Sequence, residues 1–168
     1  MSDALRALRP MIAVFALLLL LWWGFDTLLD RRARPNSGLV TGAGAPARLV
    51  LEAGPGGHYR VPGEINGQSV QLLVDTGASH VAVPGHIAER LGLERGPGMR
   101  VQTAAGTVRA YATTLDRIEI GGLAVRDVRG SINPSMDADF VLLGMTFLRH
   151  VDLRQENGRL ILQAPGDA

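Results

Sequence analysis

Leu72-Leu73-Val74-Asp75-Thr76-Gly77-Ala78-Ser79 lies near the middle of this 168-residue chain and joins an apolar run to an acid, a hydroxyl and a glycine. The residues from Val70 to Val74 have the length and apolar character of a buried strand. An aspartate at the end of such a strand can do acid–base chemistry, and a glycine lets another backbone segment come close. A second apolar run ends in a glycine at Phe140-Val141-Leu142-Leu143-Gly144. Together the two segments predict a site that carries a carboxylate at the end of a strand.

The composition limits the classes of function that the chain can serve. Its formal net charge is +1 and 20% of its residues are charged, so no strong field attracts nucleic acid, and we expect no nucleic-acid partner. The chain has no cysteine, which excludes disulfides, thiol catalysis and zinc held by thiolates. Its four histidines lack the spacing of metal-binding motifs. We therefore expect no metal and no cofactor.

Residues 11–29 are predicted to form a transmembrane helix after an N-terminal tail over residues 1–10. The segment from Met11 to Phe25 has no charge and includes five consecutive leucines. A helix that continues to Leu29 would rise about 28 Å, close to the about 30 Å of a bilayer's hydrocarbon core. Asp26 fits this interpretation only at the level of the lipid headgroups. A cleaved signal peptide is the alternative, because the apolar part is short and two arginines precede it.

Residues 30–46 are predicted to be a flexible linker, and residues 47–168 a separate domain. The linker is rich in arginine, glycine, alanine and proline and has no apolar period. Arginines flank both sides of the apolar segment, so the positive-inside rule is nearly balanced and leans slightly toward a cytoplasmic domain. Local charge therefore does not settle the orientation.

The domain over residues 47–168 is predicted to be nearly all β, with one or two short helices, because the 21 glycines and few aromatic residues favour turns and short strands. Asn66-Gly67 and Asn157-Gly158 are signals for two-residue hairpin turns. Pro62-Gly63 is predicted to interrupt a strand. The expected elements are strands at 49–52, 58–61, 64–65, 70–74, 81–83, 115–120, 123–128, 151–154 and 160–163, a hairpin over 100–112, and helices at 84–91 and 144–149.

The order of these features resembles the retropepsin-like aspartic proteases, single-lobe relatives of pepsin, and in particular a bacterial branch that carries an N-terminal membrane segment. The resemblance covers residues 59–162 and is strongest at 72–79 and 141–144. It implies a mostly β, closed barrel or sandwich fold, preceded here by the transmembrane helix. It also implies a bacterial inner-membrane protein whose protease domain lies on the periplasmic side.

The resemblance implies specific roles for residues of both segments. Asp75 would be the catalytic aspartate, Thr76 would brace the active-site loop across a dimer, and Gly77 would bring a backbone N–H near the carboxylate. The residues expected to support this loop are Thr76, Gly77, Ala78, Ser79, Leu143 and Gly144. The residues expected to form a flap over the substrate are Thr103, Ala104, Ala105, Gly106 and Thr107.

The chain supplies only half of the chemistry that this resemblance implies. Peptide hydrolysis of this type uses two carboxylates about 3 Å apart that share one proton. No aspartate other than Asp75 is followed by Thr-Gly or Ser-Gly. The second carboxylate must then come from another molecule, which predicts a twofold homodimer with Asp75 at its axis. The expected activity is hydrolysis of an extended peptide by an aspartic endopeptidase.

Three other interpretations compete with this one. The domain could be a catalytically silent module of the same fold that binds peptides or forms dimers, since a fold does not guarantee an activity. It could also be structural cargo behind a signal peptide. Ser79-His80 beside an aspartate suggests a serine hydrolase, but neighbouring residues on a strand point to opposite faces, which argues against that pairing.

Overall fold

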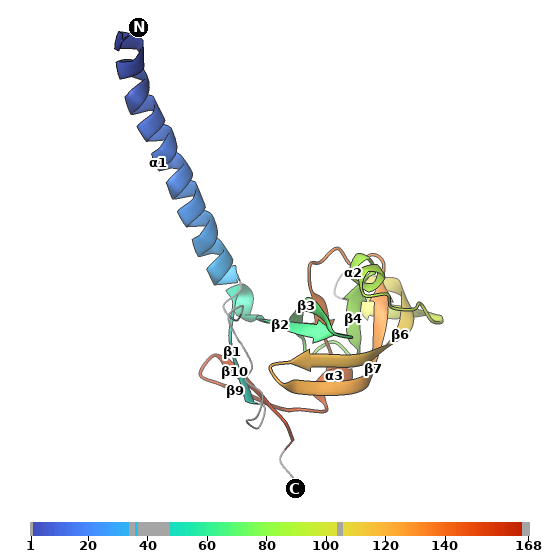
Figure 1. Ribbon diagram of the computed structural model, residues 1–168. Coiled ribbons are helices and arrows are strands. Elements are labelled where there is room, and N and C mark those ends of the chain that lie inside the picture. The colour runs from blue at the N-terminus through green and yellow to red at the C-terminus, as the bar shows by residue number, and fades with distance from the viewer. Residues whose placement is uncertain (1, 34–35, 37–47, 104–105, 166–168) are drawn as a thin grey trace. The chain divides into compact units, whose positions relative to one another are not determined.

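The computed structural model describes residues 2–33, 36, 48–103 and 106–165. The chain divides into two units, Met1–Arg34 and Pro35–Ala168, which are described separately. The elements, labelled in Figure 1, are α1 (Ser2–Ala33), β1 (Arg48–Glu52), the 3-10 helix η1 (Pro55–Gly57), β2 (Tyr59–Ile65), β3 (Gln68–Val74), β4 (Val81–Pro84), α2 (Gly85–Arg90), β5 (Gly98–Thr103), β6 (Gly106–Ile120), β7 (Leu123–Asn133), β8 (Val141–Leu143), α3 (Met145–Leu148), β9 (Asp152–Glu156) and β10 (Arg159–Gln163).

The first unit is one helix, α1, which extends beyond the predicted range at both ends and includes residues expected as tail and as linker. Within the described residues, no helix combines the length and the apolar character needed to cross a membrane. The transmembrane helix expected over 11–29 is therefore not found. The uncharged run stops at Phe25, and Asp26 follows in the same helix, whereas a span needs about 20 predominantly apolar residues.

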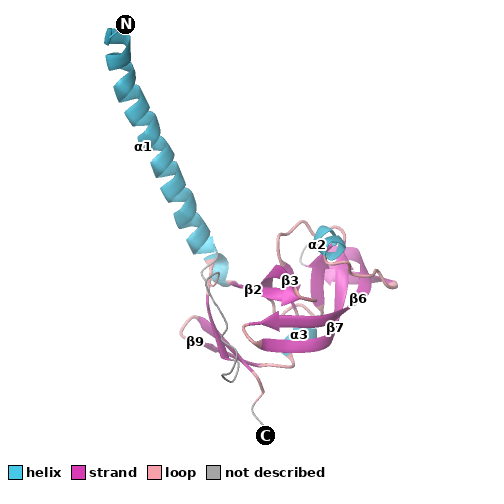
Figure 2. Cartoon of the chain, viewed as in Figure 1, coloured by secondary structure: helices cyan, strands magenta, loops and turns pink. Residues whose placement is uncertain are grey.

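The second unit is built from two sheets, as the strands in Figure 2 show. Seven strands follow the order β2-β3-β8-β4-β7-β6-β5, and a further pairing of β2 with β6 closes this sheet on itself. The pairs β3–β8 and β4–β7 are parallel, while the pairs formed by hairpins are antiparallel. The remaining strands form a small sheet in the order β1-β10-β9. The expectation of a mostly β domain with short helices is confirmed.

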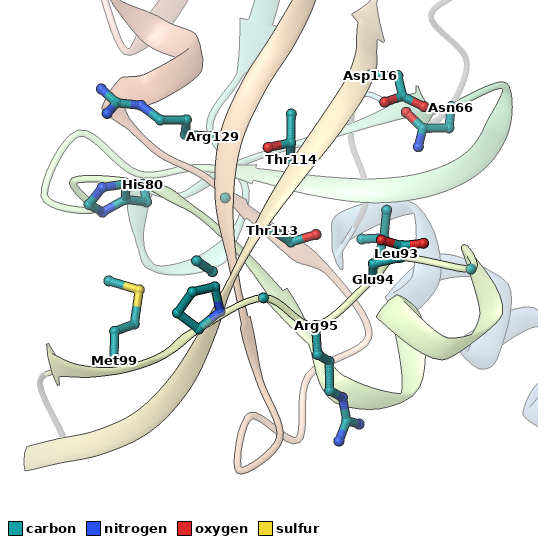
Figure 3. A pocket seen from close by; sticks show the side chains of 15 residues that line it. Asn66, His80, Leu93, Glu94, Arg95, Met99, Thr113, Thr114, Asp116 and Arg129 are labelled. Atoms are coloured by element: carbon teal, nitrogen blue, oxygen red, sulfur yellow. The ribbon is translucent and has the colours of Figure 1, made fainter.

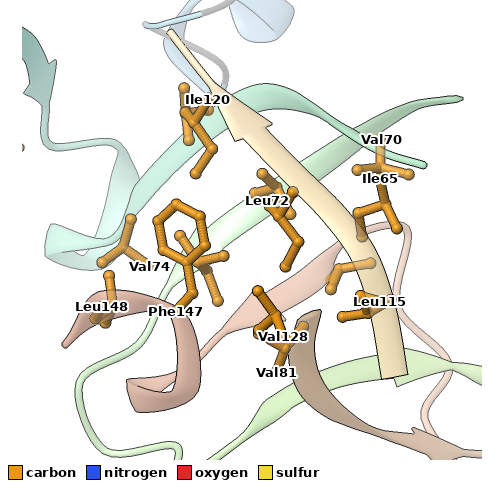
Figure 4. Close-up of a cluster of buried hydrophobic side chains, with 14 of the residues drawn as sticks. Ile65, Val70, Leu72, Val74, Val81, Leu115, Ile120, Val128, Phe147 and Leu148 are labelled. Carbon is orange, nitrogen blue, oxygen red and sulfur yellow. The ribbon is translucent and has the colours of Figure 1, made fainter. Parts of the chain in front are cut away.

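One cluster of buried apolar side chains fills the closed sheet (Figure 4). Leu72 and Val74 reach it from β3, and Leu115 reaches it from β6. Phe147 of α3 is completely buried and lies beside Val74 in Figure 4. A phenylalanine buries 150–250 Å² of surface at roughly 25 cal/mol per Å², so this contact anchors α3 against the end of β3.

The two predicted hairpin turns form as expected. Asn66 and Gly67 join β2 to β3 with φ of 52° and 77°, and Asn157 and Gly158 join β9 to β10 with φ of 50° and 76°. Positive φ at both central residues is the geometry of a type I′ turn, which Asn-Gly favours. Such a turn also fixes the register of β3, and with it the face on which each side chain of that strand lies.

The predicted break at Pro62-Gly63 is wrong, because β2 runs through both residues. The turn closes on the pair Ile65–Gln68, and antiparallel pairs alternate, so Pro62 faces Gln71 in a pair that exchanges no hydrogen bonds. On its other side β2 pairs with β6 at Glu64 and Ile65, and the described residues show no pairing of Pro62 there. The missing N–H of proline therefore costs no ladder bond at this position.

Position 36, predicted as part of a linker, is fixed to the domain. The Asn36 side chain is 3% exposed and donates hydrogen bonds to the carbonyl oxygens of Glu52 and Arg60, at 3.0 and 2.8 Å. It also accepts one from the Glu52 backbone N–H at 2.9 Å. The linker prediction therefore fails at this residue, because one amide side chain satisfies three backbone groups of β1 and β2. Residues 34–35 and 37–47 lie outside the described residues.

Candidate active site

Asp75 lies directly after β3, at the point where this strand leaves the closed sheet. β3 runs parallel to β8 with Val74 opposite Leu143, and the Asp75 backbone N–H donates to the Leu143 carbonyl oxygen at 3.2 Å. Leu143 is fully buried, whereas Asp75 is half-buried. A core strand therefore fixes the backbone of an acid whose side chain still reaches solvent.

The loop after Asp75 curls back on the carboxylate. The Gly77 N–H donates to Asp75 Oδ1 at 2.9 Å, and the Ala78 N–H donates to the Asp75 carbonyl oxygen at 3.2 Å. Asp75 Oδ2 has no hydrogen-bond partner within the described part of the chain. One carboxylate oxygen is thus oriented by the backbone, and the other remains available to a molecule outside the chain.

A second segment supports this loop through buried contacts. The Met145 N–H donates to the Ala78 carbonyl oxygen at 2.8 Å, and the Val81 N–H donates to Thr146 Oγ1 at 3.0 Å. Gly144 lies against the loop so closely that a Cβ there would overlap the His80 carbonyl oxygen and lie 2.6 Å from that of Ala78. The segment Leu143–Gly144 therefore lies where the sequence predicted loop support, and only glycine fits at its end.

A pocket of about 780 Å³, called the active-site pocket below, opens at Asp75. Gly77, Ala78 and Ser79 line it with Asp75, while Thr76 is exposed and lies outside the lining. The remaining lining comes from the end of the same loop, from β4 and β8, from both strands of the β5–β6 hairpin, and from β7 with the residues after it: His80, Ala82, Met99, Arg100, Val101, Gln102, Thr103, Val108, Ala110, Ser131, Asn133, Ser135, Met136 and Leu142.

The predicted flap corresponds to the tip of the β5–β6 hairpin. Thr103 faces Gly106 in register, and Thr103 Oγ1 donates to the Gly106 carbonyl oxygen at 2.7 Å. Thr107 Oγ1 donates to Gln102 Oε1 at 2.8 Å on the neighbouring pair. Of these predicted flap residues only Thr103 lines the active-site pocket, and Ala104 and Ala105 lie outside the described residues.

Ser79 and His80 lie in a bend before β4 and not on a strand, so the expected alternation of their side chains does not apply. Both residues line the active-site pocket. Among the described residues, however, no hydrogen bond joins the Ser79 hydroxyl to the His80 ring. A serine nucleophile needs a base within hydrogen-bond reach, and this pair shows no such contact.

A second pocket of about 770 Å³, called the outer pocket below, shares His80 and Met99 with the active-site pocket. Figure 3 shows these two residues on one side of the outer pocket and Asn66 and Asp116 on the opposite side. The outer pocket is also lined by Arg95 and Arg129, but neither Asp75 nor residues 76–79 after it are part of its lining. It therefore lacks the acid on which the proposed chemistry depends.

Three polar residues of this region carry no functional signal in the sequence. Thr146 is 5% exposed and holds the backbone at Val81, while Ser131 and Asn133 line the active-site pocket from β7. Each is a single polar residue in or beside an apolar run, which carries no signal until the strand order is known. The sequence could have indicated Ser131 only if the apolar pattern had placed it in the core, where a polar residue is unusual.

Comparison with known proteins agrees with this geometry. A family model described as "gag-polyprotein putative aspartyl protease" matches residues 61–150, which include Asp75 and Gly144. A Sinorhizobium protein named "Uncharacterized protein in cobV 5′ region" is 30% identical over 122 residues, which make up 70% of this chain and 52% of that relative. The chain thus spans about half the length of the curated relative that it matches.

A solved bacterial structure shares this fold. The crystal structure of a retropepsin-like aspartic protease from Rickettsia conorii is 25% identical and covers 71% of this chain and 92% of its own, with a TM-score of 0.58. The EIAV protease in complex with the inhibitor HBY-793 is 22% identical and covers 54% of this chain and 84% of its own, with a TM-score of 0.44. The resemblance inferred from the two glycine-containing motifs is confirmed, and the chain belongs to the retropepsin-like aspartic proteases.

Proposed function

We propose that this protein is an aspartic endopeptidase and that Asp75 is its catalytic carboxylate. Membership of the family supports aspartic protease function. The observation that carries the assignment to Asp75 is its position at the active-site pocket, with Oδ1 held by the Gly77 N–H and Oδ2 without a partner among the described residues. A carboxylate in this arrangement can exchange protons with a water molecule and a peptide carbonyl.

The proposed mechanism pairs Asp75 with the Asp75 of the partner subunit in a twofold homodimer. The ionised carboxylate takes a proton from a water molecule, and the oxygen of this water attacks the scissile carbonyl carbon. The protonated carboxylate gives its proton to the carbonyl oxygen. The C–N bond of the tetrahedral intermediate then breaks as the first carboxylate gives the proton that it took from water to the leaving nitrogen. The second carboxylate takes back the proton on the former carbonyl oxygen as the C=O bond re-forms. Two carboxylates this close must share one proton, so the dyad is active in its singly protonated form.

The loop geometry supports the role of a fixed half-site. The bonds of Asp75 and Ala78 to the β8–α3 segment hold the loop from behind, so the carboxylate keeps one position. Thr76 is exposed, and its hydroxyl has no hydrogen-bond partner in the described part of the chain. A free hydroxyl beside the dimer axis could bond to the partner subunit's loop, as the resemblance implies for this residue.

The proposed substrate is an extended peptide bound beneath the β5–β6 hairpin. Val101 and Val108 of the hairpin line the same pocket as Asp75. An extended segment between the hairpin and the loop could pair its backbone with β-strand edges, while its side chains enter pockets on alternate sides. The hairpin would then serve as the flap that covers the substrate.

The assignment of Asp75 can be tested by cleavage of a peptide library with the full-length protein in detergent. Asp75→Asn should reduce cleavage to background while the melting temperature stays close to that of the wild type. Asp116→Asn is the matched control, because Asp116 is an exposed acid on β6 that lines only the outer pocket. Undiminished cleavage by Asp75→Asn would refute the mechanism, and a wild-type protein that binds peptides without cleaving any would favour the silent-module alternative.

The shared site can be tested separately by mixing subunits. Wild-type protein is mixed with increasing amounts of Asp75→Asn protein and given time to exchange subunits. If the site needs one carboxylate from each copy, mixed dimers are inactive. The activity per wild-type chain then falls as variant is added, whereas it would stay constant if each copy acted alone. Activity that depends only on the amount of wild-type chain, however much variant is added, would exclude the dimeric site.

We also propose that α1 attaches the protein to the bacterial inner membrane, with the protease domain on the periplasmic side. The support is a continuous set of exposed apolar side chains, of which Trp22 and Trp23 are 70% and 69% exposed. Tryptophan favours the boundary between lipid and water, and apolar helix surface binds there. Membrane fractionation should recover the full chain with the inner membrane, and a reporter enzyme at the C-terminus should be active only in the periplasm. A protein found in the soluble fraction, or a cytoplasmic reporter, would contradict this proposal.

A further inference from the structure

Three strands each contribute one side chain to a row along the active-site pocket. Leu142 of β8 is in register with Ala82 of β4, and Ala82 is in register with Ser131 of β7. All three line the pocket. Residues directly opposite one another on paired strands lie on the same face of a sheet, so an apolar, a small and a polar side chain stand side by side. The sequence neighbours Val81 and Ile132 are fully buried in the core on the other face.

Three polar residues are buried among the described residues: Asn36, Ser131 and Thr146, with 3%, 4% and 5% exposure. Ser131 differs from the other two. Asn36 and Thr146 both form hydrogen bonds through their side chains, whereas the Ser131 hydroxyl has no partner among the described residues. No fully enclosed side-chain oxygen or nitrogen of the described residues lacks a partner, so the small exposed part of Ser131 includes its hydroxyl and faces the pocket. The Ser131 hydroxyl can therefore form hydrogen bonds with water or with a ligand in the pocket.

A second unused donor stands beside it on the same strand. Asn133 is two residues further along β7, so its side chain lies on the same face as that of Ser131 and also lines the pocket. Asn133 Oδ1 accepts a hydrogen bond from the Ser135 N–H at 3.0 Å, which orients the side-chain amide. Its NH₂ group has no acceptor within the described part of the chain. β7 therefore offers a hydroxyl and an amide to whatever occupies the pocket.

We propose that Ser131 and Asn133 form a polar subsite that selects a substrate residue with a neutral carboxamide side chain, asparagine or glutamine, close to the scissile bond. This inference rests on the proposed function, since it assigns specificity within the same pocket. A carboxamide oxygen can accept from both the hydroxyl and the NH₂ group, and its nitrogen can donate back to Ser131 Oγ. The small side chain of Ala82 leaves room beside Ser131 for such a group.

An apolar or an ionised side chain fits this subsite less well. A leucine of similar size would cover the Ser131 hydroxyl without replacing its hydrogen bond to water, and a site with unpaired polar groups discriminates against such a substrate. A carboxylate would lose its hydration beside Leu142 and Ala82, which carry no charge. Arg100 lines the pocket but is exposed on the hairpin, where solvent screens it.

The test uses peptides built on one sequence that the full-length protein cleaves. Each position within three residues of the scissile bond carries asparagine, leucine or aspartate in turn. At one position we expect kcat/KM for asparagine to exceed that for leucine by about tenfold, which is the effect of one to two buried hydrogen bonds, and to exceed that for aspartate. Ser131→Ala should bring the asparagine-to-leucine ratio close to one, and Ser69→Ala, an exposed serine on β3 outside the pocket, should keep the wild-type ratio. A ratio that Ser131→Ala leaves unchanged, or a wild-type preference for leucine or aspartate at every position, would overturn the proposal.

A binding measurement separates this inference from the proposed function. The same peptides, or the sequence of any peptide that binds if none is cleaved, are titrated by calorimetry into Asp75→Asn protein and into Asp75→Asn/Ser131→Ala protein. Tighter binding of the asparagine peptide to the first protein and equal binding of both peptides to the second would support the subsite even if the wild type proves inactive. Equal binding of the asparagine and leucine peptides to the first protein would overturn it.

Discussion

The loop from Asp75 to His80 and the hairpin of β5 and β6 face the same pocket but are held in different ways. The loop is bonded to a buried segment behind it at Asp75 and Ala78, and Val81, the residue that follows it, is bonded to Thr146 of that segment. The hairpin depends on one edge strand, since β5 ends the sheet and, among the described strands, pairs only with β6. Every described residue of β5 is exposed or half-buried.

This difference matches what each region would have to do in the proposed reaction. A catalytic carboxylate gains from a fixed position, because proximity and orientation supply much of the rate. A cover over a peptide must open and close, which requires a region of low local stability. We therefore expect changes behind the loop to cost global stability, and equivalent changes in the hairpin to affect local opening alone.

The largest contrast should come from adding one methyl group to a glycine in each region. A Cβ at Gly144 would overlap the backbone carbonyl of His80, which cannot move without shifting the loop, so Gly144→Ala should cost about 3 kcal/mol in the free energy of unfolding and most of the activity. A Cβ at Gly98 on β5 would meet only the Arg109 side chain at 3.5 Å, so Gly98→Ala should change that free energy by less than about 0.5 kcal/mol. Urea denaturation measures both, and equal losses would contradict the contrast.

An intermediate effect is expected from the hydroxyl that supports the start of β4. Thr146→Val keeps the volume of the side chain but leaves the Val81 N–H buried without an acceptor, which should cost about 1–3 kcal/mol. Thr146→Ser keeps the oxygen and is the matched control, with a smaller loss from the missing methyl group. The two variants are compared by thermal and urea unfolding. If the serine variant is the less stable one, packing and not the hydrogen bond supports the loop.

The sequence predicted the loop well because its signals are local. An apolar strand that ends in Asp75-Thr76-Gly77 and a second one that ends at Gly144 are visible as short motifs, and the Asn-Gly turns fix where the hairpins reverse. The pattern of short strands then followed from the spacing of glycines and apolar residues. The hairpin was located by the small residues at its tip, but its length was not, since β6 continues to Ile120 without a break.

The features that the sequence did not predict depend on contacts between distant segments. Asn36 bonds to Glu52 and Arg60, which lie 16 and 24 residues away, and Thr146 bonds to a residue 65 positions earlier. Ser131 reaches the pocket only because β7 lies beside β4 in the sheet. In none of these cases does the sequence around the residue indicate its partner. The ends of α1 were also missed, because helix formation tolerates the charged residues that flank the apolar run.

The smallest effect is expected at the tip of the hairpin. Thr103→Val removes the hydroxyl that donates to the Gly106 carbonyl oxygen, but that carbonyl is half-exposed and water can replace the lost donor. The free energy of unfolding should change by less than about 0.5 kcal/mol. Hydrogen exchange should instead become faster at the amides of β5 and the start of β6. The amides of Val81 and Met145 should keep their protection, because their acceptors, Thr146 Oγ1 and the Ala78 carbonyl oxygen, lie outside the hairpin. A loss of stability as large as that of Thr146→Val, or faster exchange at Met145, would mean that the hairpin and the loop open together and that the cover is not an independent part.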